Sequence, residues 1–214
     1  MIKVENFRTY GWESCVHGVR NPMNSWDRID SDFTLNFHGA PSIGPNDLDL
    51  MCRLCKGGAD DRKFLRQIFV TCDLTMPLYA WKQADQYKIG TVTNSCSTMH
   101  KIAGKEFTLD DFSCEHLFND DEWEMLRFKD ALVFIIKELN VARDKYLETK
   151  DKKYWWQMIQ LLPSSYNQKR TWSGNYEVLR NIYHARKNHK LDEWRDFCEE
   201  IEKLPYAKEL IVGE

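Results

Sequence analysis

The stretch from Leu162 to Arg186, LPSSYNQKRTWSGNYEVLRNIYHAR, decides how the chain is interpreted. Its first half is polar with strand-like alternation and ends near Trp172. A helix is predicted to begin near Asn175, because apolar residues then recur at helical spacing: Val178, Leu179, Ile182 and Ala185. The same helix carries Asn175, Asn181 and Arg186, polar groups that amphipathicity alone does not require.

The remaining segments predict an α+β fold in a single domain over residues 1–214. Residues 67–75, QIFVTCDLT, are rich in β-branched and apolar residues and indicate a strand. Residues 1–45 are irregular and suggest a short strand followed by long loops, while residues 89–102, IGTVTNSCSTMHKI, suggest a loop with a functional role. Helices are predicted over residues 47–56, from Pro77 through PLYAWKQADQY, and over 122–149, 152–161 and 191–204.

Bulk properties exclude several classes of protein. A chain of 214 residues supports one substantial core, and 43% hydrophobic with 29% charged residues is ordinary for a soluble globular protein. The net charge of −3 argues against a general nucleic-acid-binding surface. No signal peptide or apolar span of membrane-crossing length is visible, so we expect a cytoplasmic protein with no membrane partner.

The cysteines and histidines do not indicate a metal centre. Seven cysteines are an odd number, and Cys52 and Cys55 form a C-x-x-C at the end of a predicted helix, without a second pair at zinc-like spacing. Structural burial is the favoured interpretation, ahead of metal or redox chemistry. His184, His189 and Asp192 do not share one helical face, so no metal is expected. Motifs typical of hydrolases, P-loop NTPases and Rossmann folds are missing from the sequence.

Two blocks of sequence resemble one family. The spacing LP-x8-W-x2-N-x3-L-x-N-x4-R, read from Leu162, resembles the C-terminal signature of the flavin-dependent thymidylate synthases. Upstream, residues 69–100 resemble the strand, helix and loop that lead into the family's second signature, R-H-R-x3-S-x-N-E-x-S-x-R-Y. The resemblance covers most of residues 47–201 and implies an α+β protomer of a homotetramer with sites formed between subunits.

The resemblance also assigns roles to individual residues. Aligned from Pro77, Gln86-Tyr87-Lys88 falls on R-H-R, and one inserted residue brings Asn94 and Ser97 onto the motif's Asn and second Ser. The implied substrate-binding residues are Gln83, Lys88, Ser97 and Arg186, with Ser97 also the catalytic candidate. The implied cofactor-binding residues are Tyr87, Asn94, Asn175 and Asn181.

The implied reaction transfers a one-carbon unit from methylenetetrahydrofolate to C5 of dUMP. FAD is the implied cofactor and NADPH the implied reductant, with no covalent protein nucleophile because the bound groups supply the chemistry.

Each assignment has a simpler structural alternative. Arg186 could be a cation favoured by the helix dipole, Asn175 a helix cap and Asn181 a solvated residue. Ser97 lies in a loop rich in Ser and Thr, and Lys88 and Gln83 suit an exposed helix face.

Departures from the family pattern leave two other functions open. One cation, Lys88, replaces two arginines of R-H-R, and lysine lacks the bidentate fork of arginine. Ser95, Met99 and His100 stand where the family has Glu, Arg and Tyr. The chain could therefore modify another pyrimidine nucleotide with the same chemistry, or bind flavin and nucleotide without turnover.

Overall fold

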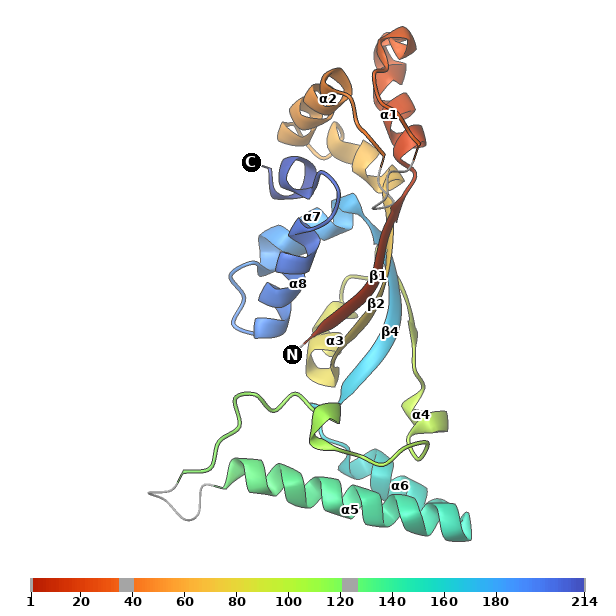
Figure 1. Cartoon of the computed structure of the whole chain (residues 1–214), viewed down its shortest axis with the longest axis vertical. Coiled ribbons are helices and arrows are strands. Elements are labelled where there is room, and N and C mark those ends of the chain that lie inside the picture. The colour runs from red at the N-terminus through yellow and green to blue at the C-terminus, as the bar shows by residue number, and fades with distance from the viewer. Residues whose placement is uncertain (1, 35–40, 121–126, 214) are drawn as a thin grey trace. The chain divides into compact units, whose positions relative to one another are not determined.

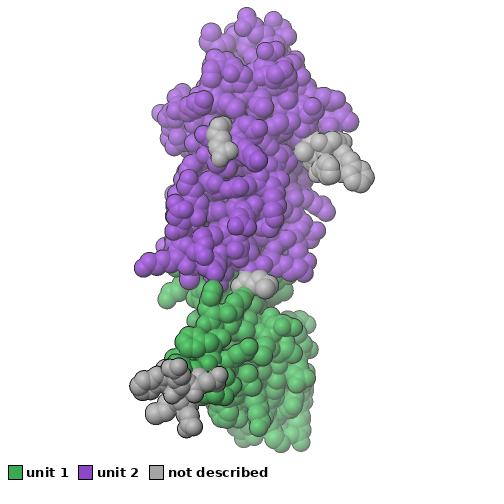
Figure 2. Space-filling view, turned by 60° about the vertical axis from the view of Figure 1, so that its left-hand side comes forward, with its two compact units in different colours: residues 1, 75–84, 95–170 green, residues 2–74, 85–94, 171–214 purple. Residues whose placement is uncertain are grey.

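The computed structural model describes residues 2–34, 41–120 and 127–213. These residues form two compact units, coloured separately in Figure 2. Unit 1 contains residues 75–84 and 95–170, and unit 2 contains residues 2–74, 85–94 and 171–214. Each unit therefore gathers segments that are far apart in the sequence. The predicted organisation as a single domain stays a prediction.

Four strands form one antiparallel sheet in the order β1-β2-β4-β3 (Figure 1). They are β1 (Lys3–Tyr10), β2 (Phe69–Pro77), β4 (Asn167–Asn175) and the short β3 (Val92–Ser95). Alternate residues of β2 are buried, as expected for a sheet with one covered face. On the other face Asp73 accepts hydrogen bonds from Asn6 Nδ2 at 3.0 Å and from Thr171 Oγ1 at 2.8 Å. Around Asp73 this second face is thus polar, whereas Phe69 of the same strand is an exposed apolar residue.

Unit 2 packs helices against the apolar face of its strands. The two C-terminal helices are α7 (Tyr176–Arg186) and α8 (Asp192–Glu202). Phe197 of α8 stacks on Phe7 of β1 with ring centroids 6.4 Å apart and meets Trp172 of β4 edge-on at 6.3 Å. The unit also contains α1 (Trp12–Arg20), α2 (Pro45–Lys56), a 3-10 segment (Arg62–Gln67) and a C-terminal π-helical turn (Lys208–Val212).

Unit 1 has its own apolar core between a long helix and a shorter one. These are α5 (Phe128–Thr149) and α6 (Lys152–Leu161), and α3 (Leu78–Ala84), α4 (Thr98–Lys101) and a 3-10 turn (Leu109–Asp111) complete the unit. Asn140 of α5 holds the preceding loop by two hydrogen bonds to the backbone of Phe107, at 2.8 and 2.9 Å. The buried core residues are Ile102, Phe107, Phe112, Leu132, Ile136, Leu139, Ala142 and Met158.

A buried ion pair joins two elements of unit 2. Asp47 of α2 is 0% exposed, and its Oδ1 accepts from Arg20 Nε at 2.8 Å and Nη2 at 2.6 Å. Its Oδ2 accepts from the backbone N of Asp30 at 3.0 Å and from Ser31 Oγ at 2.7 Å. Both carboxylate oxygens are therefore satisfied, as a buried charge requires.

Several predicted elements are confirmed and others are wrong. The helix over 152–161 has the predicted bounds, and those over 47–56 and 191–204 are confirmed within three residues. Residues 12–20, expected to be loop, form α1, and the segment over 89–102 contains β3 and α4. Pro77 ends β2 instead of opening the next helix, which stops at Ala84. The helix predicted from residue 122 begins at Phe128 among the described residues, since 121–126 lie outside them.

The apolar face of α7 differs from the prediction at one position. Leu179 and Ile182 are buried as expected, but Ala185 is exposed and Tyr183 is buried in its place. The hydroxyl of Tyr183 donates to Glu202 Oε1 of α8 at 2.6 Å, so a polar end allows this large ring to face the core.

The expected structural burial of the C-x-x-C pair is confirmed for Cys55, while Cys52 is only partly buried. Cys55 is buried and its Sγ donates weakly to the carbonyl of Leu210, at 3.7 Å. Burial raises the pKa of Cys55 to about 11, so it is a thiol at neutral pH. All seven cysteines are free. Among the described residues, no helix has the length and apolar composition needed to cross a membrane, and no three metal-ligating side chains come together.

Candidate functional site

In unit 2, the loop between α3 and β3 lies along helix α7. Gly90 has φ +77°, and a Cβ built there would lie 3.1 Å from Val178 Cγ2 and 3.3 Å from Asn175 Nδ2, near the start of α7. Only glycine combines this backbone conformation with such a close approach. Three residues earlier in the loop, Tyr87 contacts Arg186 at the other end of α7. The loop therefore contacts the start of α7 through Gly90 and the end of α7 through Tyr87.

Arg186 packs against two aromatic rings. Its Nε donates to the hydroxyl of Tyr87 at 3.0 Å. The guanidinium carbon lies 5.0 Å from the ring centroid of Trp194 in α8 and 5.7 Å from that of Tyr87. The two rings are themselves 6.0 Å apart, so all three side chains form one cluster, here called the Arg186 cluster. A guanidinium held by cation–π contacts and one hydrogen bond keeps four further N–H donors.

Cations lie near His189, whose ring meets Trp194 of the Arg186 cluster edge-on at 6.5 Å. Among the residues that the structure describes, no carboxylate is found paired with Arg186. The pKa of neighbouring His189 is lowered, first by burial and then by the nearby cations Arg186, Arg195 and Lys190. Within the described part of the chain, one hydrogen bond of the half-buried Arg186 is seen, and an arginine with N–H donors to spare is suited to binding an anion such as a phosphate.

Asn175 is the N-cap of α7. Its Oδ1 accepts from the backbone N of Val178 at 3.0 Å, which satisfies one of the free N–H groups at the helix start. Its Nδ2 faces the side-chain-free Gly90. The residue therefore has a structural role, and its amide nitrogen alone remains as a donor to a ligand.

The capping role of Asn175 can be tested by substitution. We expect Asn175→Ala to lower the free energy of unfolding by about 1 kcal/mol because the cap is lost, and Asn175→Ser to restore most of it. Urea denaturation measures this change. Asn181→Ala is the matched control on the same helix, because Asn181 is exposed and should change stability little. A cap contribution is contradicted if Asn175→Ala leaves the unfolding midpoint unchanged.

The other unit 2 candidates are exposed. Lys88 lies one residue after Tyr87, with its side chain in solvent. Asn94 is exposed in β3, and Asn181 is exposed on α7 three residues after Val178, one turn from the Gly90 contact. The structure thus brings Tyr87, Asn175 and Arg186 to one loop–helix contact. The side chains of Lys88, Asn94 and Asn181 are exposed on the surface of unit 2.

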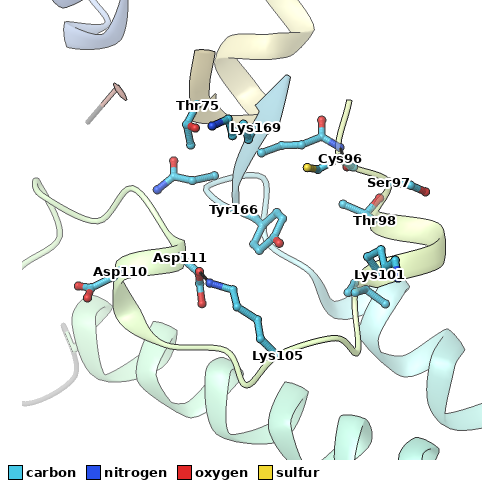
Figure 3. Close-up of a pocket in the computed structure, with 13 residues that line it drawn as sticks. Thr75, Cys96, Ser97, Thr98, Lys101, Lys105, Asp110, Asp111, Tyr166 and Lys169 are labelled. Atoms are coloured by element: carbon cyan, nitrogen blue, oxygen red, sulfur yellow. Dashed lines mark hydrogen bonds and ion pairs between the residues drawn. The ribbon is translucent and has the colours of Figure 1, made fainter. Parts of the chain in front are cut away.

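In unit 1, Ser97 lines a pocket of about 280 Å³, here called the Ser97 pocket. Figure 3 shows Tyr166 near its centre, between the loop at Cys96–Thr98 and the turn that carries Asp111. The Tyr166 ring packs edge-on against Phe112 at 5.6 Å, and its pKa is raised by burial and by the charge of Asp111. The lining residues are Thr75, Cys96, Ser97, Thr98, Lys101, Ile102, Lys105, Asp110, Asp111, Tyr166, Asn167, Gln168 and Lys169.

Charges in the Ser97 pocket are only partly neutralised. Lys105 forms an ion pair with Asp111, whose other oxygen accepts from the backbone N of Thr108 at 2.9 Å. Lys101 adds an exposed cation to the lining. Ser97 caps α4 by accepting from the backbone N of His100 at 3.2 Å, which leaves its own O–H free to donate.

Sequence patterns did not reveal every residue of these sites. Gln83 lies in α3 of unit 1 but is not among the residues that line the Ser97 pocket. Trp194 was assigned only to the apolar face of its helix, and nothing in its spacing signals the contact with Arg186. Tyr166 was not singled out, because it comes to Ser97 from a segment that is distant in the sequence. Lys101 is near Ser97 in the sequence, at the end of α4, but this segment was expected to be a loop.

Solved structures that share the fold of this chain include flavin-dependent thymidylate synthases. The chain superposes on thymidylate synthase X (ThyX) from Helicobacter pylori, solved with FAD and dUMP, with a TM-score of 0.72 over 99% of this chain and 97% of that chain. A second structure of the flavin-dependent thymidylate synthase ThyX from H. pylori, complexed with FAD and dUMP, gives 0.70 over 98% and 97%. Sequence identity is 15% in both cases. Neither a family model nor a curated protein matches the sequence.

The chain therefore has the fold of the flavin-dependent thymidylate synthases, along almost its whole length. The predicted α+β fold of this type is confirmed.

Proposed function

We propose that the protein is a divergent flavin-dependent thymidylate synthase. It transfers a one-carbon unit from methylenetetrahydrofolate to C5 of dUMP, giving dTMP, with FAD as cofactor and NADPH as reductant. The observation that carries this proposal is the match of 99% of the chain to an enzyme of this kind crystallised with FAD and dUMP. The Arg186 cluster supports it, since it presents a fixed cation at the position that the resemblance assigns to the nucleotide.

In this proposal the chain binds the nucleotide through cations and hydroxyls. Arg186 meets the phosphate through its open N–H donors, and Lys88 adds a second, solvent-exposed charge. Ser97 donates its hydroxyl to a carbonyl oxygen of the pyrimidine and holds the ring in place, and Gln83 contributes a further polar contact. The assembly is a homotetramer with sites formed between subunits, so Ser97 and Arg186 of one site need not come from the same copy.

The residues assigned to FAD offer groups that suit a flavin. Asn94 and Asn181 carry exposed amides, which can both donate to and accept from the polar edge of an isoalloxazine ring. Asn175 has its Nδ2 left after capping α7, and Tyr87 offers its ring edge while its hydroxyl contacts Arg186. When bound, reduced flavin supplies the reducing equivalents for the one-carbon transfer. The protein orients the bound reactants so that the reacting atoms lie close together.

A titration of the purified protein with FAD, followed by flavin fluorescence with and without dUMP, tests the proposal. We expect saturable binding whose fluorescence changes when dUMP is added, because the two ligands share a site. Riboflavin serves as a control for non-specific ring stacking. Absence of FAD binding under both conditions would remove the proposed enzyme function and leave the fold assignment intact.

A second candidate is the same chemistry on another pyrimidine nucleotide. The observation that favours it is the single flexible cation Lys88, exposed to solvent, where the family has two arginines. Contacts of this kind determine which substrate is accepted. Comparing turnover of dUMP with that of dCMP and UMP decides between the two candidates, and a clear preference for dCMP or UMP would establish the second.

A further inference from the structure

We propose that Gln168 is a positioning residue, which holds the loop that carries Ser97 and so sets where the Ser97 hydroxyl meets the pyrimidine ring. This inference rests on the proposed function, in which Ser97 contacts the pyrimidine. Gln168 acts through the backbone of Cys96, the residue before Ser97. All three residues belong to unit 1 and line the Ser97 pocket.

The segment around Ser97 has little regular structure of its own. Cys96 and Ser97 lie between the end of β3 and the start of α4, and α4 is four residues long. The hydroxyl of Ser97 accepts from the backbone N of His100 at 3.2 Å, so its position follows the backbone of this short turn. A helix of one turn is not stable by itself. The direction in which Ser97 donates therefore depends on contacts from outside the turn.

Strand β4 supplies two such contacts, both to Cys96. The backbone N of Cys96 donates to the carbonyl of Lys169 at 2.9 Å, and its carbonyl accepts from Gln168 Nε2 at 2.9 Å. A third contact comes from α6, where Trp155 Nε1 donates to the carbonyl of Met99 at 3.1 Å. Gln168 is 7% exposed, so water does not readily replace the hydrogen bond that its side chain makes.

A glutamine fits this place because its two neighbours require opposite hydrogen-bonding groups. Arg170 Nε donates to Gln168 Oε1 at 3.0 Å, and a guanidinium carries donors and no acceptor. The carbonyl of Cys96, on the other side, is an acceptor and carries no donor. The amide of Gln168 offers an oxygen to the first and an N–H to the second. Its orientation is therefore determined by both neighbours.

One buried ring anchors both Arg170 and the backbone of Gln168. The guanidinium carbon of Arg170 lies 4.2 Å from the ring centroid of Trp81, which is fully buried in α3. Trp81 Nε1 also donates to the backbone carbonyl of Gln168 at 2.8 Å. The contacts thus run from Trp81 in the core through Arg170 and Gln168 to the loop before Ser97.

Hydrogen exchange of the free protein, followed by mass spectrometry, tests whether Gln168 holds this loop. Gln168→Glu keeps the shape of the side chain and its contact with Arg170, but turns an acceptor toward the Cys96 carbonyl. We expect the backbone amides of residues 96–101 to exchange about 5- to 10-fold faster in this variant. Gln157→Glu is the matched control, because exposed Gln157 also donates to a carbonyl, that of Lys153 at 3.2 Å. It should leave residues 96–101 unchanged.

A double-mutant cycle tests whether Gln168 acts through Ser97. Calorimetry on the FAD-loaded protein measures dUMP affinity. We expect Gln168→Glu and Ser97→Ala each to weaken dUMP binding about 3- to 10-fold, the effect of one hydrogen bond between uncharged groups. In the Ser97→Ala background, Gln168→Glu should weaken it less than about twofold, because the group that Gln168 positions is gone.

A second variant separates loss of the hydrogen bond from the added charge. Gln168→Leu removes the donor to Cys96 and introduces no charge, so it should give the same pattern of exchange and affinity. Thermal unfolding shows whether each variant is folded. If Gln168→Glu does not fold, Gln168→Leu decides the result.

The outcomes separate this inference from the proposed function. Wild-type protein that binds FAD and dUMP, with Gln168 variants that exchange at the wild-type rate at residues 96–101, overturns the positioning role alone. Equal losses of dUMP affinity with and without the Ser97 hydroxyl overturn it as well, since Gln168 would then act independently of Ser97. Wild-type protein that binds neither FAD nor dUMP overturns the proposed function and this inference together.

Discussion

Replacing Asp47 by alanine should lower the free energy of unfolding by about 3–5 kcal/mol, the cost of leaving a buried charge without its partner. Asp47 is fully buried and accepts four hydrogen bonds, two of them from Arg20, whose side chain is only 8% exposed. The substitution leaves the Arg20 guanidinium buried and releases Ser31 and the backbone N of Asp30. Since a domain of this size is stabilised by only about 5–15 kcal/mol, much of unit 2 should become prone to unfolding.

Urea denaturation of the two proteins measures this loss. Asp49→Ala is the control, because Asp49 lies two residues away on the same helix and pairs with Arg53 in an exposed ion pair, with both side chains 67% exposed. Its loss should cost about 0–1 kcal/mol. Equal effects of the Asp47 and Asp49 substitutions would show that the buried network contributes no more than a surface pair.

Replacing Arg186 by alanine should weaken dUMP binding by about 10- to 100-fold, the range for a hydrogen bond to a charged group. The reason is that Arg186 is the half-buried cation with open donors in the Arg186 cluster, whereas Lys88 is exposed and screened by solvent. Arg186→Lys should recover less than half of the lost binding free energy, because an ammonium cannot make the bidentate contact. Calorimetry with dUMP and deoxyuridine measures both effects.

Arg53→Ala provides the control for lost charge at an exposed arginine, and it should leave dUMP affinity unchanged. Stability is followed in parallel, since Arg186 also packs on Trp194. Full dUMP affinity in Arg186→Ala would remove Arg186 from the nucleotide site.

The sequence indicated much of the fold through local periodicity. Helices α6, α7 and α8 carry strong apolar stripes and clear stops, and their bounds were predicted to within about three residues. Helix α1 was missed although Trp12, Cys15, Val16 and Val19 have helical spacing, because the surrounding Gly, Pro and Asn residues indicated loops. The break of the helix at Ala84 could not be predicted, since the residues that follow leave α3 to join unit 2.

Less of the candidate site could be predicted from the sequence alone. Spacing placed Arg186 and Asn175 on one helix, and the cap made by Asn175 was among the alternatives considered. The contact of Tyr87 with Arg186 joins residues 99 positions apart, and such pairs follow from the tertiary fold and not from local pattern. The same holds for Trp194, which served only as a core residue in the sequence pattern.

The measurement that tests the central claim most directly is release of tritium from dUMP labelled at C5. Transfer of a carbon unit to C5 must displace the hydrogen there, so the label enters water when the proposed reaction occurs. We predict release that requires FAD, NADPH and methylenetetrahydrofolate together and falls at least tenfold in Arg186→Ala. Protein that binds FAD and dUMP but releases no tritium with all reactants present would contradict the assignment as a thymidylate synthase.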